Sequence, residues 1–354
     1  MNAEKEVIVV TGSSGLIGRA AVIRLAEKFR VAGFDRDGDP YPPPQAECIC
    51  VDLTSDKSVE AGFTRVRIGY GGRIASLVHL GAYYSFSGEP SPLYEQVTVR
   101  GTERLLRELQ GFETGQFIFS STMLVHAPTE PGKPINEDSP LEPKWDYPKS
   151  KVETERLIHE QRGDIPAVIL RIAGVYDDGG HSIPIAHQIQ RIHERQITSK
   201  LFPGDISHGQ SFLHLDDLID AIALTVDRRR ELPTETALLL GEPETMSYDE
   251  LQRTLGRLIH DEEIETREIP KSVAKTGAWL EDAVPLHESF IKPWMIDLAD
   301  DHYEVDITRA RQLLGWEPKH SLRATLPKMV AALKADPEAF YCENKLERCK
   351  PKAQ

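Results

Sequence analysis

Cysteine is scarce in this chain. Its 354 residues include four cysteines, Cys48, Cys50, Cys342 and Cys349, and no two of them form a Cys-x-x-Cys pair. They also form no cluster with histidine at the spacing of a metal site, so we expect no bound metal. A small disulfide-stabilised domain is not expected either, and the thiols fit a protein of a reducing compartment.

Long apolar runs and long basic runs are both missing. No stretch of 18 apolar residues occurs, so we expect no membrane-spanning helix. Lysine and arginine number 42 against 56 aspartates and glutamates, which gives a net charge of −14. An acidic chain of this kind is a poor partner for nucleic acid or for an anionic membrane. We expect no secretion signal before the first predicted strand, and therefore a cytoplasmic protein.

Short runs rich in β-branched residues alternate with amphipathic stretches along the first half of the chain. This alternation indicates an α/β fold, a doubly wound parallel sheet of the Rossmann type with helices on both faces. The predicted strands lie at residues 7–10, 30–35, 48–52, 77–80, 116–120 and 168–172. The predicted helices between them lie at residues 16–28, 58–63, 93–109 and 149–161.

The alternation ends after Tyr176, and short helices dominate the rest of the chain. Residues 1–176 and 205–240 are therefore predicted to form the Rossmann domain. Residues 177–204 and 241–340 are predicted to form a smaller, mostly helical substrate-binding lobe, and residues 341–354 a charged tail. The later predicted helices lie at residues 185–194, 216–226, 247–259, 272–283, 307–314 and 321–333, and the later strands at 212–215 and 236–240.

A glycine-rich turn, Thr-Gly-Ser-Ser-Gly-Leu-Ile-Gly at residues 11–18, joins the first predicted strand to the first predicted helix. Glycine lets the backbone turn tightly and approach a pyrophosphate, which then lies at the helix N-terminus. In this strand-turn-helix context the turn predicts dinucleotide binding. The residues of the turn expected to contact the dinucleotide are Gly12, Ser14, Gly15, Leu16, Ile17 and Gly18.

Asp35 ends the second predicted strand. An acid at this position accepts hydrogen bonds from the adenosine ribose hydroxyls, and its charge repels a 2′-phosphate. NAD is therefore favoured over NADP. Arg36 argues the other way, because a neighbouring cation could pair with that phosphate.

Tyr147 and Lys151 lie four residues apart in Tyr-Pro-Lys-Ser-Lys. A helix places both side chains on one face. A phenol normally loses its proton near pH ~10, and a nearby lysine cation and the positive nicotinamide ring would lower that pKa. A phenol tuned in this way can take a proton from an alcohol while hydride leaves the same carbon.

The glycine spacing, Asp35 and the Tyr-x-x-x-Lys pair together resemble the short-chain dehydrogenase/reductase superfamily. The length and the C-terminal lobe resemble its extended branch, the NAD-dependent epimerase/dehydratase family, over most of the chain. Further segments match that family in order: Asp-Leu at 52–53, His-Leu-Gly-Ala at 79–82, Val-Arg-Gly-Thr at 99–102, Phe-Ser-Ser-Thr at 119–122, Leu-Arg-Ile-Ala-Gly-Val-Tyr at 170–176, Phe-Leu-His-Leu-Asp-Asp at 212–217 and Leu-Gly-Trp-Glu-Pro at 314–318.

The resemblance implies roles for individual residues. Thr122 would hydrogen-bond the substrate oxygen, Tyr147 would be the acid/base, and Lys151 would hold the nicotinamide ribose and tune Tyr147. It also implies a homodimer through the helices at 93–109 and 149–161. The other cofactor contacts that it implies are Asp52, Leu53, Leu80, Gly81 and Ala82.

Three positions depart from the pattern of the sugar-nucleotide members of the family. Thr98 stands where the central helix usually carries an asparagine, Gly174 where an asparagine contacts the diphosphate, and Gln210 where an arginine clamps it. Losing these donors disfavours a sugar nucleotide as substrate. The cations that could replace them are Arg191, Arg195 and Lys200.

Side chains just after the predicted strands are candidates for the substrate site, because open α/β sheets bind ligands at the carboxyl ends of their strands. Residues 83–86, Tyr-Tyr-Ser-Phe, suit a hydroxy or keto compound with apolar surface. Core packing is the alternative for these aromatic rings, and a non-catalytic role is the alternative for His126 and for His181. The expected substrate contacts are Tyr84, Thr122, Met123, His126, Gly174 and His181.

The sequence thus predicts an NAD-dependent oxidoreductase or epimerase of the extended short-chain dehydrogenase type, acting at a carbinol or carbonyl carbon of a small molecule. Dehydration is disfavoured because Met123 and Leu124, not an acid pair, follow Thr122. A nucleotide-sugar 4-epimerase is one alternative. A non-catalytic NAD(P)-binding redox sensor is another, disfavoured because the tyrosine, lysine and threonine are all present.

Overall fold

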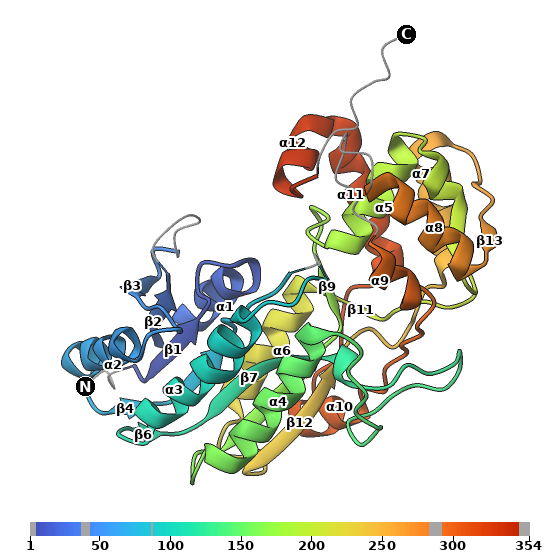
Figure 1. Ribbon diagram of the computed structural model, residues 1–354. Coiled ribbons are helices and arrows are strands. Elements are labelled where there is room, and N and C mark those ends of the chain that lie inside the picture. The colour runs from blue at the N-terminus through green and yellow to red at the C-terminus, as the bar shows by residue number, and fades with distance from the viewer. Residues whose placement is uncertain (1–4, 37–42, 86–87, 283–291, 347–354) are drawn as a thin grey trace.

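A parallel sheet covered by helices on both faces makes up the larger part of the molecule, and a second group of helices lies at one end of it (Figure 1). The computed structural model describes residues 5–36, 43–85, 88–282 and 292–346. Within these residues seven strands form one sheet in the order β12-β8-β7-β5-β1-β2-β3, and every pair is parallel. The predicted doubly wound sheet is confirmed. Its strands are β1 (Val7–Thr11), β2 (Arg30–Asp35), β3 (Ala46–Cys50), β5 (Ser76–His79), β7 (Phe117–Thr122), β8 (Ala167–Ile172) and β12 (Glu235–Leu240).

Apolar side chains pack on both faces of the sheet, which is why its strands are nearly continuous hydrophobic runs. On one face, Val10 and Val168 belong to a core that includes residues of α1 and α6. On the other face, Val9 and Phe119 belong to a core that includes residues of α2, α3 and α4. The helices are α1 (Leu16–Ala26), α2 (Asp56–Tyr70), α3 (Arg100–Leu109), α4 (Asp146–Gln161) and α6 (Leu215–Asp227).

Three of the helices depart most from their predicted bounds. Helix α2 is much longer than residues 58–63, because the Ser55 hydroxyl caps its start and the buried spacing continues to Val66. The predicted helix at 93–109 is divided into a π-helical segment (Tyr94–Val99) and α3. Helix α4 begins three residues before its predicted start, which places Tyr147 and Pro148 in its first turn, where proline is tolerated.

The smaller part of the molecule has its own hydrophobic core, which includes Ile189, Leu255, Leu326 and Phe340. Ser247 caps α7 as predicted, with its hydroxyl accepting from the Glu250 amide at 3.2 Å. None of the described helices is long and apolar enough to cross a membrane. The elements here are α5 (Ile183–His193), α7 (Tyr248–His260), α8 (Lys271–Asp282), α9 (Pro293–Asp297), α11 (Leu322–Ala335), α12 (Pro337–Glu343), β10 (Leu201–Pro203) and β13 (Arg267–Ile269).

Short strands and one further helix complete the described structure. Strand β9 (Gly174–Tyr176) pairs with β11 (Phe212–His214), and both lie where the chain passes between the two parts (Figure 1). The pair β4 (Arg73–Ile74) and β6 (Glu113–Thr114) extends one edge of the larger part. Helix α10 spans Thr308–Leu314.

The segment around α10 packs differently from its predicted place in the lobe. Tyr303, Val305, Ile307 and Trp316 belong to the core on the α1/α6 face of the sheet. The indole nitrogen of Trp316 donates to the backbone carbonyl of Asp217 in α6 at 2.9 Å. This stretch therefore belongs by its packing to the Rossmann domain, although residues 241–340 were expected to form the lobe.

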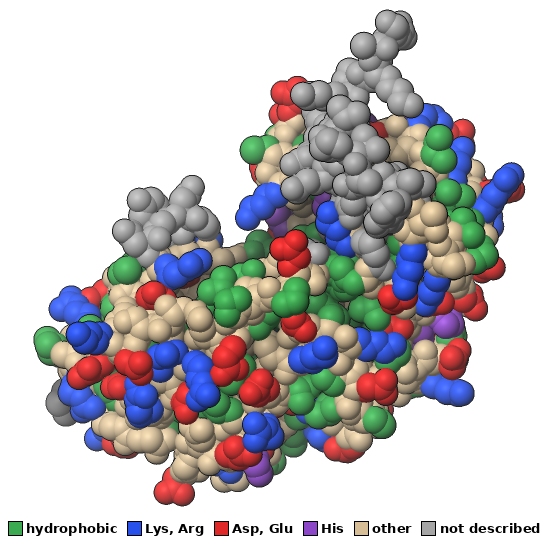
Figure 2. All heavy atoms as spheres, viewed as in Figure 1, with side chains coloured by type: hydrophobic (Ala, Val, Ile, Leu, Met, Phe, Trp, Pro, Cys, Tyr) green, Lys and Arg blue, Asp and Glu red, His purple; other side chains and the backbone are tan. Residues whose placement is uncertain are grey.

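Charged side chains of both signs cover the face of the larger part on which α3 and α4 lie (Figure 2). Many of them form exposed ion pairs. Arg100 lies 2.8 Å from Glu95, and Arg107 lies 2.5 Å from Asp56 of α2. Opposite charges on this face are therefore in part paired with one another.

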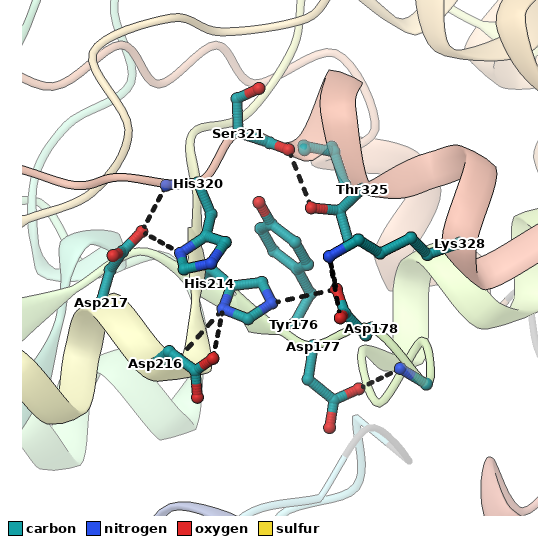
Figure 3. Close-up of polar contacts among 12 residues, drawn as sticks. Tyr176, Asp177, Asp178, His214, Asp216, Asp217, His320, Ser321, Thr325 and Lys328 are labelled. Atoms are coloured by element: carbon teal, nitrogen blue, oxygen red, sulfur yellow. Dashed lines mark hydrogen bonds and ion pairs between the residues drawn. The ribbon is translucent and has the colours of Figure 1, made fainter.

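Polar contacts join the two parts where α6, β9 and α11 meet (Figure 3). The carboxylate of Asp217 accepts from the backbone and from the ring of His320, at 2.9 and 3.1 Å. Lys328 of α11 pairs with Asp178 at 2.9 Å. Because Asp217 is only 1% exposed, its contacts are shielded from water and favour one arrangement of the parts.

Replacing Trp316 tests this packing. Trp316→Ala should lower the free energy of unfolding by about 3–5 kcal/mol, because it leaves a cavity in the sheet core. Trp316→Phe should lower it by about 1–2 kcal/mol, since it mainly leaves the Asp217 carbonyl unpaired. Urea unfolding followed by fluorescence and circular dichroism measures both, and equal small effects would contradict the assignment to the core.

Candidate active site

Two of the three glycines in the turn after β1 are required by close contacts. Gly12 has a φ of +69°, and a Cβ there would lie 2.9 Å from the Gly81 amide nitrogen. A Cβ on Gly18 would overlap the carbonyl oxygen of Gly12. Gly15 is exposed, and its Cβ would have ordinary contact distance at 3.5 Å. The turn is therefore held tightly by Gly12 and Gly18, while Gly15 leaves open space beside the start of α1.

The start of α1 offers unused hydrogen-bonding groups. The hydroxyls of Ser13 and Ser14 are buried and have no partner among the described residues. Gly15 at the N-cap brings no capping side chain, so the first amides of α1, at Leu16 and Ile17, have no side-chain acceptor from the cap. Free donors at a helix N-terminus fit the pyrophosphate of a dinucleotide.

Asp35 is fixed beside this turn. Its Oδ2 accepts from the Ser14 amide at 2.8 Å, and its Oδ1 accepts from the Arg36 amide at 2.8 Å. The carboxylate keeps further lone pairs for ribose hydroxyls. The side chain of Arg36 is exposed.

The other expected cofactor contacts gather at the ends of β3, β5 and β1. Asp52 accepts from the backbone of Thr54 at 2.9 Å, and this hydrogen bond lowers its pKa. A Cβ on Gly81 would lie 3.1 Å from Leu53, so these two residues are in close contact. The amides of Leu80 and Gly81 donate to Thr11, and Ala82 continues the segment.

A buried histidine that was not among the predicted site residues holds this segment. His79 lies between the hydroxyls of Thr11, at 2.6 Å, and Thr102, at 2.9 Å. Burial lowers its pKa to about 3, so the ring is neutral. Because the Thr102 hydroxyl donates to the Thr98 carbonyl, it accepts from Nε2–H of His79. The Thr98 hydroxyl in turn accepts from the Tyr83 amide at 3.1 Å, so the threonine at this family position orients the strand end.

Lys151 joins α4 to the end of β7. Its side chain is 2% exposed, and its Nζ donates to the carbonyl of Ser120 at 2.6 Å. The same Nζ lies 5.6 Å from the centre of the Tyr147 ring. Thr122 is the last residue of β7, two residues after Ser120. The structure therefore brings Tyr147, Lys151 and the end of Thr122's strand into one region.

The ionisation of this pair differs from the expectation for Tyr147. Burial raises the pKa of the Tyr147 phenol, and the neighbouring Tyr94 adds to the effect. Burial also lowers the pKa of Lys151 to about 7, against the opposing influence of Glu155. Both shifts have the same cause, because a low-polarity environment disfavours each charged form. Without a bound cofactor, Tyr147 is therefore a neutral phenol. Its pKa is raised, whereas the nearby lysine was expected to lower it.

Aromatic rings surround Tyr147. The Tyr84 ring meets it edge-on at 4.7 Å between ring centres, and the Trp145 ring lies 5.4 Å away. Trp294 of α9 lies 4.9 Å from Trp145. The sequence does not indicate this contact, since nothing local to α9 connects Trp294 with a residue so distant in the chain. Trp145, two residues before Tyr147, was the available signal.

Other predicted substrate residues lie elsewhere. Met123 is 2% exposed in the sheet core. His126 is fully buried, with one ring nitrogen facing the Ser139 carbonyl and the other facing Arg171. Both side chains are enclosed by protein in this structure, and their contact with a substrate stays a prediction.

The remaining substrate predictions differ in their surroundings. His181 pairs with Asp177 at 2.7 Å, which raises the pKa of the histidine. Gly174 lies against Phe212, whose ring a Cβ would meet at 2.8 Å. Thr122 is 6% exposed and its hydroxyl accepts from the Leu124 amide. Phe86 lies outside the described residues.

A second polar cluster, with His214, Asp216 and His320, has the residue types of a metal site (Figure 3). The two imidazole rings are stacked at 4.1 Å with an angle of 20° between their planes. A metal ion lies in the plane of each imidazole that binds it, and two stacked planes cannot both contain one ion. In this arrangement the cluster joins the two parts of the molecule and is not a shared metal site.

Comparison with known proteins gives consistent matches. Residues 8–241 match the model of a family described as the NAD dependent epimerase/dehydratase family. The human protein named 3 beta-hydroxysteroid dehydrogenase type 7 is 25% identical, over 90% of this chain and 93% of its own length. The dTDP-6-deoxy-L-talose 4-dehydrogenase (NAD(P)(+)) of Kitasatospora kifunensis is also 25% identical, over 94% of this chain and 97% of its own.

Solved structures share the fold. The UDP-glucose 4-epimerase of Thermotoga maritima, solved with UDP-glucose, has a TM-score of 0.71 at 21% identity and covers 93% of this chain and 99% of its own. The UDP-glucose 4-epimerase of Thermus thermophilus, solved with NAD, has a TM-score of 0.70 at 20% identity with the same coverage. At this identity the likeness concerns the fold alone.

The pKa of Lys151 makes stability depend on pH in a defined direction. The folded value of about 7 lies below the ordinary 10.5, so between these values the folded protein binds fewer protons than the unfolded chain. Stability from this group therefore rises with pH through the window. Relative to Lys151→Met, the free energy of unfolding of the wild type should rise by about 2 kcal/mol between pH 7 and 9, at roughly 1.4 kcal/mol per unit. Urea unfolding at several pH values measures this, and a pH-independent difference would contradict it.

Proposed function

The chain belongs to the NAD-dependent epimerase/dehydratase family, and we propose that it oxidises an alcohol or reduces a carbonyl with NAD, using Tyr147 as the acid/base. The observation that carries the proposal is the meeting of Tyr147 and the buried Lys151 at the end of β7, where Thr122 also lies. The unused donors at the start of α1 and the fixed carboxylate of Asp35 support the cofactor assignment.

Each of the three residues has a distinct task. NAD held by the start of α1 and by Asp35 would supply the hydride acceptor, or in its reduced form the donor. Tyr147 takes the hydroxyl proton of an alcohol or gives a proton to a carbonyl oxygen. Lys151 sits on the same face of α4 and favours the phenolate when it is charged. The Thr122 hydroxyl orients the substrate oxygen toward the phenol.

The substrate that these surroundings favour is not a standard sugar nucleotide. A diphosphate needs cations or amide donors, and Gly174 and Gln210 supply neither a cation nor the expected asparagine. Two lysines of this region are already neutralised. Lys144 pairs with Asp301 at 3.0 Å, and Lys271 pairs with Asp300.

A nucleotide-sugar 4-epimerase is the second candidate, because the Thermotoga maritima structure holds UDP-glucose on the same fold. The two candidates differ in the fate of the cofactor. An epimerase regenerates its oxidised cofactor in each cycle and converts UDP-glucose without net NADH, whereas a dehydrogenase accumulates NADH. Incubation with UDP-glucose and NAD, followed by product analysis, separates them.

The homodimer stays a proposal. The segments expected to form it, at residues 93–109 and 149–161, carry charged pairs on their exposed sides instead of a broad apolar stripe. Such a surface fits a polar, salt-sensitive interface. The charged residues concerned are Arg100, Glu103, Arg107, Lys149, Arg156 and Glu160.

Tyr147→Phe removes the proposed acid/base without changing the size of the ring. Turnover with a carbonyl substrate and NADH should fall by roughly 10²–10⁴-fold, while the dissociation constant of NADH stays within about twofold. Tyr70→Phe on α2 is the matched control and should keep full activity. Full turnover in Tyr147→Phe would refute the mechanism, and tight NADH binding without turnover of any alcohol or carbonyl by the wild type would favour a redox sensor.

Asp35→Asn tests the cofactor preference. The amide can still accept from the Ser14 amide but no longer repels a 2′-phosphate. The dissociation constant of NADPH should fall relative to that of NADH by roughly 10- to 100-fold, which corresponds to about 1.4–2.8 kcal/mol. Fluorescence titration of the reduced cofactors measures the ratio, with Asp56→Asn, on the exposed first turn of α2, as control. An unchanged ratio would mean that Asp35 does not select the cofactor.

A further inference from the structure

Glu155 lies one turn after Lys151 on the same face of α4, and its carboxylate contacts two strands of the sheet. Its Oε1 accepts from the Ser121 hydroxyl of β7 at 2.5 Å. Its Oε2 accepts from the Arg171 guanidinium of β8 at 2.7 Å. The side chains of Glu155 and Arg171 are 10% and 9% exposed, so this ion pair is largely shielded from water.

Ser121 and Arg171 hold the carboxylate from neighbouring positions of paired strands. The two residues are partners in the register of β7 and β8. Ser121 also directly follows Ser120, whose carbonyl accepts from Lys151. Because Lys151 and Glu155 contact consecutive residues of β7, two separate hydrogen bonds restrict how far apart their charged groups can lie.

The Arg171 guanidinium is itself fixed by several contacts. Its Nε donates to Oε1 of Glu155 at 3.3 Å, and its Nη1 donates to the Glu137 carbonyl at 2.8 Å. A bidentate arginine holds a carboxylate in a defined orientation, and it offsets the cost of burying that charge. Glu155 can therefore stay ionised inside the protein, one turn from Lys151.

We propose that Glu155 is a positioning residue that acts through Lys151: its fixed carboxylate favours the ammonium form of Lys151 and thereby sets the pH range in which the lysine can assist Tyr147. This inference rests on the proposed hydride transfer and adds a residue behind the Tyr147/Lys151 pair. Glu155 touches neither cofactor nor substrate in this role, because Ser121 and Arg171 occupy its oxygens.

Two opposing influences act on the ionisation of Lys151. Burial lowers its pKa to about 7, and the negative charge of Glu155 raises it. The other ionisable side chains that pack around this pair are neutral or cationic at neutral pH, since burial keeps the tyrosines and histidines uncharged. They are Tyr147 of α4, Tyr94 of the π-helical segment, His79 of β5, His126 after β7 and Arg171 of β8.

The consequence for the reaction follows from the charge of the amine. A neutral amine at Lys151 gives no electrostatic support to a phenolate at Tyr147. Without Glu155, Lys151 would lose its proton at a lower pH, and this support would be absent in the neutral range. The carboxylate behind the lysine thus compensates for part of the effect of burial.

Glu155→Gln removes the negative charge and keeps the size of the side chain. The midpoint at which Lys151 titrates should fall from about 7 by roughly one pH unit, a tenfold change in its acid dissociation constant. Urea unfolding of the full-length protein between about pH 5 and pH 9 measures the midpoint. The stability difference between a protein and its Lys151→Met counterpart is constant below that midpoint and rises with pH above it. This difference is measured in the wild type and in Glu155→Gln.

Two further substitutions separate the charge at residue 155 from other effects. Glu153→Gln is the matched control, because Glu153 is exposed on the same helix, and it should leave the midpoint unchanged. Glu155→Asp keeps the charge and should give a midpoint within about half a pH unit of the wild type.

A double variant covers the case in which Glu155→Gln fails to fold because Arg171 is left unpaired. Glu155→Gln/Arg171→Met removes both buried charges and should still lower the midpoint for Lys151. Circular dichroism verifies that each variant is folded.

The outcomes separate this inference from the function on which it rests. A lower midpoint in Glu155→Gln, with Glu153→Gln unchanged, supports it. An unchanged midpoint in Glu155→Gln, an equal fall in Glu153→Gln, or a fall as large in Glu155→Asp overturns it. The measurement requires no substrate, whereas full turnover in Tyr147→Phe would overturn hydride transfer by Tyr147 and leave the midpoint for Lys151 unaffected.

Discussion

The hydrogen bond from the Lys151 ammonium to the Ser120 carbonyl is the contact on which the candidate site depends. It fixes α4 against the end of β7, and it does so with an amine that is almost entirely buried. Burying an amine is costly unless its donors are satisfied, so the lysine holds its position only while the strand end keeps its own. Tyr147, one turn earlier on α4, and Thr122, two residues further along β7, take their places from this single junction.

The neighbouring strand end is fixed by neutral groups. His79 receives one hydrogen bond and gives one, and the threonines that partner it lie on β1 and α3. Because burial keeps this imidazole uncharged, the network stays the same across the pH range in which Lys151 titrates. The segment at residues 79–82, where the cofactor is proposed to bind, is thus insensitive to the protonation of Lys151.

The sequence predicted features that are defined by neighbouring residues, and it missed contacts between residues that lie far apart in the chain. The glycine turn, Asp35 and the Tyr147/Lys151 pair are defined within a few residues of a strand or helix end, so pattern and spacing located them. Trp294 reaches Trp145, and through it Tyr147, only because α9 folds back beside residue 88, and no local pattern encodes that approach. The burial of Met123 and His126, which follow Thr122 in sequence, is also set by tertiary packing. The packing of Trp316 on α6 likewise depends on a tertiary contact that the periodicity of α10 does not reveal.

Without a ligand, the surroundings of Tyr147 and Lys151 favour the uncharged form of both side chains. Burial pushes the pKa values of the phenol and the ammonium in opposite directions, and both shifts disfavour the charged pair that catalysis needs. A phenolate becomes favourable only when positive charge or new hydrogen bonds enter the site. Under the proposed function, an oxidised cofactor bound here would add a cationic ring, which would lower the pKa of Tyr147, and the phenolate would in turn favour the charged form of Lys151. On that proposal, proton abstraction would be coupled to cofactor binding through electrostatics.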